Sequence, residues 1–160
     1  MILSDILEKP ENDNSTFFLE YWKSRGAGGR LPGRPDIDPV DFPEQLPGVF
    51  LLEVSCPTGP HRLRLSGTGL DAAVGEDRTG QFLSAVEDGA RVSPATVLAD
   101  YEECIRSGQP RCARGLIRWP GQAALGFERL ILPLARDGRS VDMILGVMSF
   151  MKQDASRFRR

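Results

Sequence analysis

Glycine and proline recur throughout residues 26–47, and they prevent that segment from continuing a helix or entering the middle of a sheet. The residues before it predict a short helix, because Asn14, Ser15 and Thr16 are good N-cap types and the glycine at position 26 ends the pattern. The first strongly apolar run begins only at Val49. The sequence therefore predicts a helix joined by an extended, surface-lying arm to a separate sheet domain.

The composition indicates one soluble domain with extensions. The 160 residues are 41% hydrophobic and 26% charged, and such a length is enough for a single core. With 20 basic and 22 acidic residues the net charge is −2, which favours neither nucleic acid nor an anionic membrane as partner. No apolar run approaches the ~20 residues of a membrane span. The three cysteines are an odd number and the first residues lack a secretory signal, so we expect a cytoplasmic protein.

Strand and helix signals follow the arm in a definite order. Residues 49–55 and 61–66 predict an antiparallel hairpin, with Leu63 and Leu65 on one face of the second strand. Glycines break up the next segment, which predicts one or two small helices. Residues 94–107 then have the apolar spacing of an amphipathic helix.

Three strand-like runs follow, the last two joined by an Asp-Gly turn, at residues 111–119, 127–134 and 141–150. We expect an α+β fold, a five-stranded antiparallel sheet with helices packed on one face and its first strand beside its fifth. The chain then divides into an N-terminal lead, flanking helix and arm (1–45), the sheet domain (46–151) and a basic tail (152–160). Residues 1–13 are predicted to be a weakly ordered lead.

Several short motifs occur in a fixed order along the chain: Tyr21-Trp22, Arg25-Gly26, Leu31-Pro32-Gly33-Arg34, Asp38-Pro39, Leu46-Pro47-Gly48-Val49-Phe50, Arg64-Leu65-Ser66-Gly67-Thr68, Thr79-Gly80 and Leu132-Pro133-Leu134. In their order and spacing, the chain from Phe17 to Met151 resembles the stand-alone bacterial PAS domain family of alphaproteobacteria. The resemblance implies a PAS fold with an N-terminal flanking helix, a sensory or regulatory role and no catalysis of its own. It implies no particular cofactor or ligand, because PAS domains differ widely in what they hold.

Aromatic side chains recur at i,i+4 spacing on the predicted helix and need a partner surface. The resemblance implies that a helix before the sheet packs on the outer sheet face or against a second copy. Aromatic residues are favoured interface anchors, so we expect a homodimer interface at Phe17, Phe18, Tyr21 and Trp22. The alternative is that this helix packs only on its own sheet.

A carboxylate interrupts an apolar strand face and is the main candidate for a ligand contact. Glu128 shares its face with leucines 130, 132 and 134, so it lines a cavity if that face looks into the helices. Arg64, Arg114 or Tyr101 would then be its partner. Alternatively, Glu128 lies at the strand mouth in water. The candidate ligand-binding residues are thus Arg64, Tyr101, Trp119 and Glu128, although Tyr101 and Trp119 could simply fill the core.

Other chemical signals in the sequence are weak. The run Gly67-Thr68-Gly69-Leu70-Asp71-Ala72 matches a dinucleotide-binding pattern, but the strand before it alternates Arg with Leu and a glycine interrupts the helix after it. His61 is the single histidine and no metal-ligand spacing accompanies it, so we expect a solvated side chain and no metal site. The chain lacks the Asn-Cys-Arg-Phe motif of flavin photochemistry, and Cys104 is expected to pack in the core.

The sequence favours a non-catalytic sensory or regulatory module that binds a small molecule, a partner protein or both in cytoplasmic signal transduction. We expect a homodimer and a signalling partner protein, and neither nucleic acid nor membrane as a partner. Two alternatives stay open. One is a ligand-free interaction adaptor, and the other is a small acid/base enzyme with Glu128 as base and Tyr101 as proton donor. The enzyme has no nucleophile motif or metal set to support it.

Overall fold

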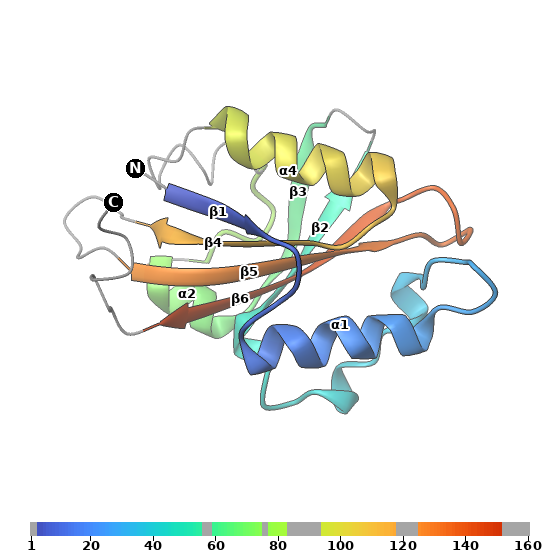
Figure 1. Cartoon of the computed structure of the whole chain (residues 1–160), viewed down its shortest axis with the longest axis horizontal. Helices are drawn as coiled ribbons and strands as arrows, with labels where there is room; N and C mark the ends of the chain where they lie inside the picture. The colour runs from blue at the N-terminus through green and yellow to red at the C-terminus, as the bar shows by residue number, and fades with distance from the viewer. Residues whose placement is uncertain (1–2, 56–58, 75–76, 83–93, 118–124, 152–160) are drawn as a thin grey trace.

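A computed structural model describes residues 3–55, 59–74, 77–82, 94–117 and 125–151. One antiparallel sheet forms its centre, with helices on both sides (Figure 1). The strands are β1 (Leu3–Leu7), β2 (Val49–Val54), β3 (His61–Ser66), β4 (Arg111–Ile117), β5 (Leu125–Leu134) and β6 (Met143–Met151). The α-helices are α1 (Asp13–Arg25), α2 (Thr68–Val74) and α4 (Pro94–Ser107), and three 3-10 turns are η1 (Arg34–Asp36), η2 (Pro39–Asp41) and η3 (Leu46–Gly48).

The sheet has six strands in the order β1-β4-β5-β6-β2-β3. The first predicted strand, β2, pairs with the last, β6, as the sequence predicted. The sixth strand comes from the supposed lead, because β1 pairs with β4 from Leu3 opposite Leu116 to Leu7 opposite Cys112. The expectation of a weakly ordered N-terminal lead was therefore wrong for residues 3–7.

The two faces of the sheet carry separate apolar cores, and alternation along each strand distributes side chains between them. On one face, leucines 130, 132 and 134 of β5 pack with residues of α1. On the other face, Ile131 packs with α2 and α4 through Leu70, Tyr101, Cys104 and Ile105. The expected arrangement, with helices on one face and a flanking helix, is confirmed, and α1 covers the face opposite α4 (Figure 1).

Helix α1 packs closely on its own sheet. It starts earlier than predicted, because the N-cap is Asn12, whose side chain accepts a hydrogen bond from the backbone N–H of Asn14, and it ends at Gly26 as expected. The ring of Phe18 packs edge-on against Phe42 with a centroid distance of 4.9 Å. Trp22 Nε1 donates a 2.8 Å hydrogen bond to the carbonyl oxygen of Pro133 on β5.

The arm between α1 and β2 is partly buried, which differs from the predicted course over the surface. Its 3-10 turns direct Ile37 and Phe42 into the core beneath α1. Backbone hydrogen bonds join it to the β5–β6 connection, since Leu31 N–H donates to the carbonyl of Gly138 and Ala135 N–H donates to that of Pro32. The arm is therefore part of the folded domain and contributes to its core.

The β2–β3 hairpin contains an irregularity that the alternating sequence did not reveal. Leu52 lies opposite Leu63, whereas Leu51 lies opposite Leu65, so one extra residue is accommodated in β3. As a result Leu63 is buried in the core beneath α4, but Leu65 is 43% exposed. The prediction that these two leucines share one face of the strand was wrong, because the bulge reverses the alternation between them.

Neighbouring phenylalanines on α1 provide a test of this packing. Phe18 is 0% exposed and Phe17 is 38% exposed. Phe18→Ala should lower the free energy of unfolding by about 3–5 kcal/mol, because it leaves a cavity under the helix. Phe17→Ala is the matched control and should cost no more than about 1 kcal/mol. Urea denaturation measures both, and equal losses would contradict the packing of α1 described above.

Candidate functional site

Two charged clusters lie inside the protein, one on each face of the sheet. Adjacent residues of β5 begin them, because alternation sends Glu128 to the face beneath α1 and Arg129 to the face beneath α4. We call the residues Asp100, Tyr101, Arg111 and Arg129 the Arg129 cluster. We call the residues Glu11, Asn12, Arg114 and Glu128 the Glu128 clasp.

In the Arg129 cluster, two guanidinium groups share one carboxylate. Arg111, at the start of β4, donates from Nε to Oδ1 of the buried Asp100 on α4. Arg129 donates from a terminal nitrogen to the other oxygen, Oδ2, of the same residue. Each oxygen of Asp100 therefore holds a different arginine, and α4 is tied to β4 and β5 by charge-assisted hydrogen bonds.

Tyr101 completes this cluster. Its ring is buried beneath α4, and the central carbon of the Arg129 guanidinium lies 5.1 Å from the ring centroid, within cation–π range. Arg129 is only 8% exposed, yet its Nε has no hydrogen-bond partner among the described residues. The arrangement holds a guanidinium in a fixed plane and leaves one of its buried donors unused.

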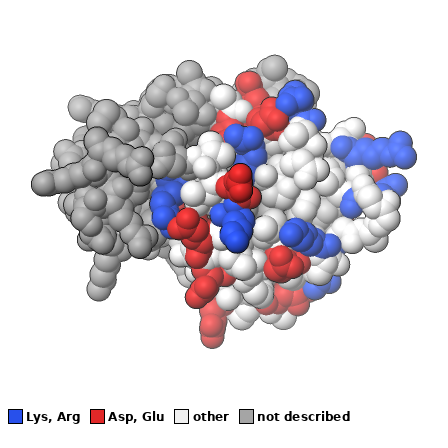
Figure 2. Space-filling view, in the orientation of Figure 1, with Lys and Arg blue, Asp and Glu red and all other residues white. Residues whose placement is uncertain are grey.

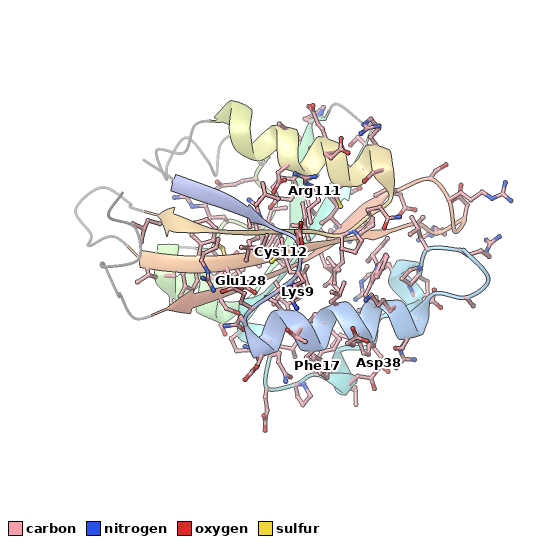
Figure 3. All side chains as sticks on the ribbon, in the orientation of Figure 1. Lys9, Phe17, Asp38, Arg111, Cys112 and Glu128 are labelled. Atoms are coloured by element: carbon pink, nitrogen blue, oxygen red, sulfur yellow. The ribbon has the colours of Figure 1, made fainter. Side chains whose placement is uncertain are left out.

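The Glu128 clasp lies on the opposite face, where the chain passes from β1 into α1 (Figure 3). The side chain of Glu128 is 0% exposed, and its carboxylate accepts hydrogen bonds from the backbone N–H groups of Glu11 and Asn12 at N···O distances of 3.0–3.3 Å. Arg114 approaches the same carboxylate at 3.6 Å and also forms an ion pair with the Glu11 side chain. Glu128 thus holds the start of α1 against β5.

The candidate ligand residues from the sequence do not form one site. Glu128 is buried beneath α1, so the reading that placed it in water at the strand mouth was wrong. Tyr101 lies across the sheet from it, and Arg64 is exposed on the edge strand β3. Trp119 lies outside the described residues. The predicted partnership of Glu128 with Arg114 is observed, whereas partnership with Arg64 or Tyr101 is not.

Sequence reasoning missed the residues that surround Tyr101. A signal for them is present, because Glu128 and Arg129 are adjacent charges within a strand that is otherwise apolar on both sides. Buried charges are rarely tolerated without partners, so such a pair predicts one ion-paired group on each face. Asp100, one turn before the apolar Cys104, was the available partner on α4.

The buried thiols are not nucleophiles. Burial, with Asp100 nearby, raises the pKa of Cys104 to about 12, and burial, with Glu128 nearby, raises that of Cys112 to about 12. The thiolate is the reactive form of cysteine, so both side chains act as packing groups. Core packing of Cys104 was predicted and is confirmed by its complete burial.

His61 is buried, although the sequence predicted a solvated side chain. It is 2% exposed at the start of β3, opposite Val54, and both ring nitrogens are without hydrogen-bond partners in the part of the chain that the structure describes. Burial lowers the pKa of His61, while the charge of Glu102 on α4 opposes this shift. No group of three or more metal-ligating side chains occurs among the described residues.

Stability should depend on pH through His61. Its pKa in the folded protein lies below the ordinary value of 6.5, so as pH falls the unfolded chain binds the proton first. The free energy of unfolding should be highest above that ordinary value and should decrease as pH falls through it toward the folded pKa. Urea denaturation from about pH 7.5 to about pH 5.5 measures the slope of the free energy of unfolding against pH, in a range above the pKa values of most carboxylates. Since His61 is the single histidine, His61→Gln should flatten it, and an unchanged slope would contradict the buried neutral state.

Removal of the charge from the clasp should loosen the start of α1. Glu128→Gln keeps the side-chain size but replaces one acceptor oxygen with a donor facing other donors, so the free energy of unfolding should fall by about 1.5–3 kcal/mol. Hydrogen exchange of the amides of Glu11 and Asn12 should accelerate. The control Glu103→Gln removes a surface pair with Arg106 and should cost less than about 1 kcal/mol. Unchanged amide protection at Glu11 and Asn12 would disprove the clasp.

Comparison with known proteins agrees with this architecture. The family model described as PAS domain matches residues 11–149, and no curated protein matches the chain. Among solved structures, the dark structure of the blue-light photoreceptor Aureochrome1 LOV has a TM-score of 0.56 at 13% identity, over 80% of this chain and 93% of that one. The PAS domain of Bordetella pertussis BvgS has a TM-score of 0.54 at 13% identity, over 77% of this chain and 93% of that one.

A LOV domain studied with a flavin analogue is similar to the same degree, with a TM-score of 0.55 at 14% identity over 74% of this chain and 85% of that one. At such identities the solved structures support the fold alone. None of the helices in the described ranges is both long and apolar enough to cross a membrane. PAS domains are in general sensory modules of signal transduction without catalytic activity. The match over most of its length and the six-stranded fold together show that this chain belongs to the PAS domain family.

Proposed function

We propose that the protein is a non-catalytic sensory module of cytoplasmic signal transduction that binds a small molecule at the Arg129 cluster. The observation that carries the proposal is the guanidinium of Arg129, which is buried on the face beneath α4 and stacked on Tyr101 with an unused donor. Small-molecule sites combine mostly apolar walls with a few oriented polar groups. The apolar residues around this cluster are Phe50, Leu52, Leu63, Leu70, Ile131 and Ile144.

Helix α1 is the proposed route to a partner protein. It packs on β5 and β6 opposite the Arg129 cluster, and its start is held by the adjacent residue of β5, Glu128. Binding beneath α4 that changes the conformation of β5 would therefore act on both faces of the same strand. A ligand shifts such an equilibrium only by its differential affinity for two states.

A homodimer remains part of the proposal, with a smaller interface than the sequence suggested. Phe18 is fully buried within its own chain and is not available to a second copy, and Trp22 is partly buried with its N–H group bound to the Pro133 carbonyl. Phe17 remains partly exposed and stacks on Tyr21, and Val40 of the arm is largely exposed. We propose that a second copy contacts this outer side of α1 through Phe17.

Of the two alternative functions that the sequence left open, the structure argues against the acid/base enzyme and is compatible with the ligand-free adaptor. The acid/base enzyme needs Glu128 and Tyr101 to act on one substrate, and these residues lie on opposite faces of the sheet. A ligand-free adaptor is favoured by one observation, the complete burial of Tyr101 and Cys104 in a packed core. The adaptor is therefore the competing function.

Mass spectrometry of the freshly purified protein separates the sensor from the adaptor. Under native conditions the protein should carry a small molecule that denaturing conditions release, and an absorption spectrum of the same sample identifies any chromophore. Arg129→Met should reduce the retained fraction at least about tenfold, because loss of hydrogen bonds from a charged group costs about 1.5–3 kcal/mol. Arg64→Met, on the exposed edge strand, is the matched control and should retain the ligand. A folded wild-type protein without bound mass would favour the adaptor.

A further inference from the structure

We infer that the molecule bound at the Arg129 cluster is an anion with a planar or tetrahedral oxyanion group, a carboxylate or a phosphate. This inference rests on the proposed ligand site and names the chemical class of its ligand. It follows from the charge balance of the cluster, from the geometry of the unused donor and from the surroundings of the two arginines.

The charge balance of the cluster is positive. Arg111 and Arg129 bring two cationic groups to the single carboxylate of Asp100. Arg129 is 8% exposed, so its charge is largely removed from water. Burial of a charge is costly unless a counter-charge and hydrogen bonds offset the lost hydration. An anionic ligand would supply both.

Among the described acidic residues of α4, Asp100 is the one that pairs with these arginines, although the charge of Glu103 also acts on Arg111. Glu103 forms an ion pair with Arg106 at the surface. The charge of Glu102 acts on His61. Glu128, next to Arg129 in sequence, is engaged with α1 on the other face of the sheet. Within the described part of the chain, the carboxylate paired with Arg111 and Arg129 is that of Asp100 alone.

The unused donor belongs to a guanidinium, a group whose shape suits oxyanions. A guanidinium presents its N–H groups in a rigid planar fork, which binds carboxylate or phosphate oxygens in pairs. Asp100 takes a terminal nitrogen of Arg129, and Nε of the same group is buried with no acceptor among the residues that the structure describes. The Tyr101 ring stacks on the guanidinium face and so orients this edge before any ligand arrives. Less reorganisation on binding favours affinity.

Arg111 supplies a second contact at the outer side of the cluster. Its Nε donates to Asp100, and its side chain is 28% exposed. The two terminal nitrogens of the guanidinium carry the remaining N–H donors of the group. It lies at the first residue of β4, whereas Arg129 lies within β5. An anion held by Arg129 on the inside and by Arg111 toward solvent would have a path of entry.

The test uses the full chain labelled with nitrogen-15 and follows the Nε–H signals of its arginines by NMR. Sodium phosphate and sodium acetate are titrated separately against sodium chloride at matched ionic strength and constant pH. The Arg129 signal, assigned by its loss in Arg129→Met, should shift saturably with phosphate, acetate or both, and the responding anion identifies the class. In Arg111→Met, which removes the more exposed arginine, the same shift should require at least about tenfold more anion. Arg64→Met should leave the titration unchanged.

Several results would overturn the inference. Small, non-saturating shifts of equal size at all exposed arginines would indicate an adventitious ion only. An unmoved Arg129 signal, in a protein that retains a neutral molecule by native mass spectrometry, would leave the sensor proposal standing and reject the anion. An unmoved signal in a protein that retains nothing would reject both. Arg129→Lys keeps the charge but not the fork, so equal anion affinity in that folded variant would also contradict the geometry proposed here.

Discussion

The buried carboxylate of Glu128 is the contact on which one whole face of the protein depends. It joins the centre of the sheet to the two residues just before α1 through their backbone N–H groups, which substitutions other than proline leave in place. Donors at the start of a helix are also where negative charge is favourable. Once this point is fixed, Phe18 and Trp22 reach the leucines of β5, and the arm follows over the remaining apolar surface.

Glu128 and Arg129 are adjacent on β5, and each has a different role on its own face of the sheet. Glu128 is satisfied by two backbone N–H groups and by Arg114, all within the same chain, so its role is structural. Arg129 pairs with Asp100 and stacks on Tyr101, but its Nε has no acceptor within the described ranges, so it is suited to bind a further molecule. The visible face of the surface shows acidic and basic side chains interspersed (Figure 2).

Much of the fold could be predicted from local sequence patterns. The apolar runs of β2, β4, β5 and β6, the spacing of α4 and the Asp-Gly turn are each recorded in neighbouring residues, and their order allowed the pairing of β2 with β6. The bulge in β3 could not be predicted, because it depends on how Leu63 and Leu65 meet β2. The same holds for β1, for the burial of His61 and for the face that Glu128 occupies, since each is decided by residues distant in sequence.

The topology of α1 also determines the order in which the chain can fold. The contact between Glu11 and Glu128 spans 117 positions, and β1 pairs with a strand that begins at Arg111. A ribosome makes the N-terminal segment first, whereas its binding surface on β5 and β6 is made more than a hundred residues later. Non-local contacts of this kind form slowly, because closing a long loop costs entropy before the contact repays it. The side of α1 that packs on β5 and β6 must therefore remain without that partner through most of synthesis, although Phe42 of the arm is made soon enough to contact Phe18 and Tyr21.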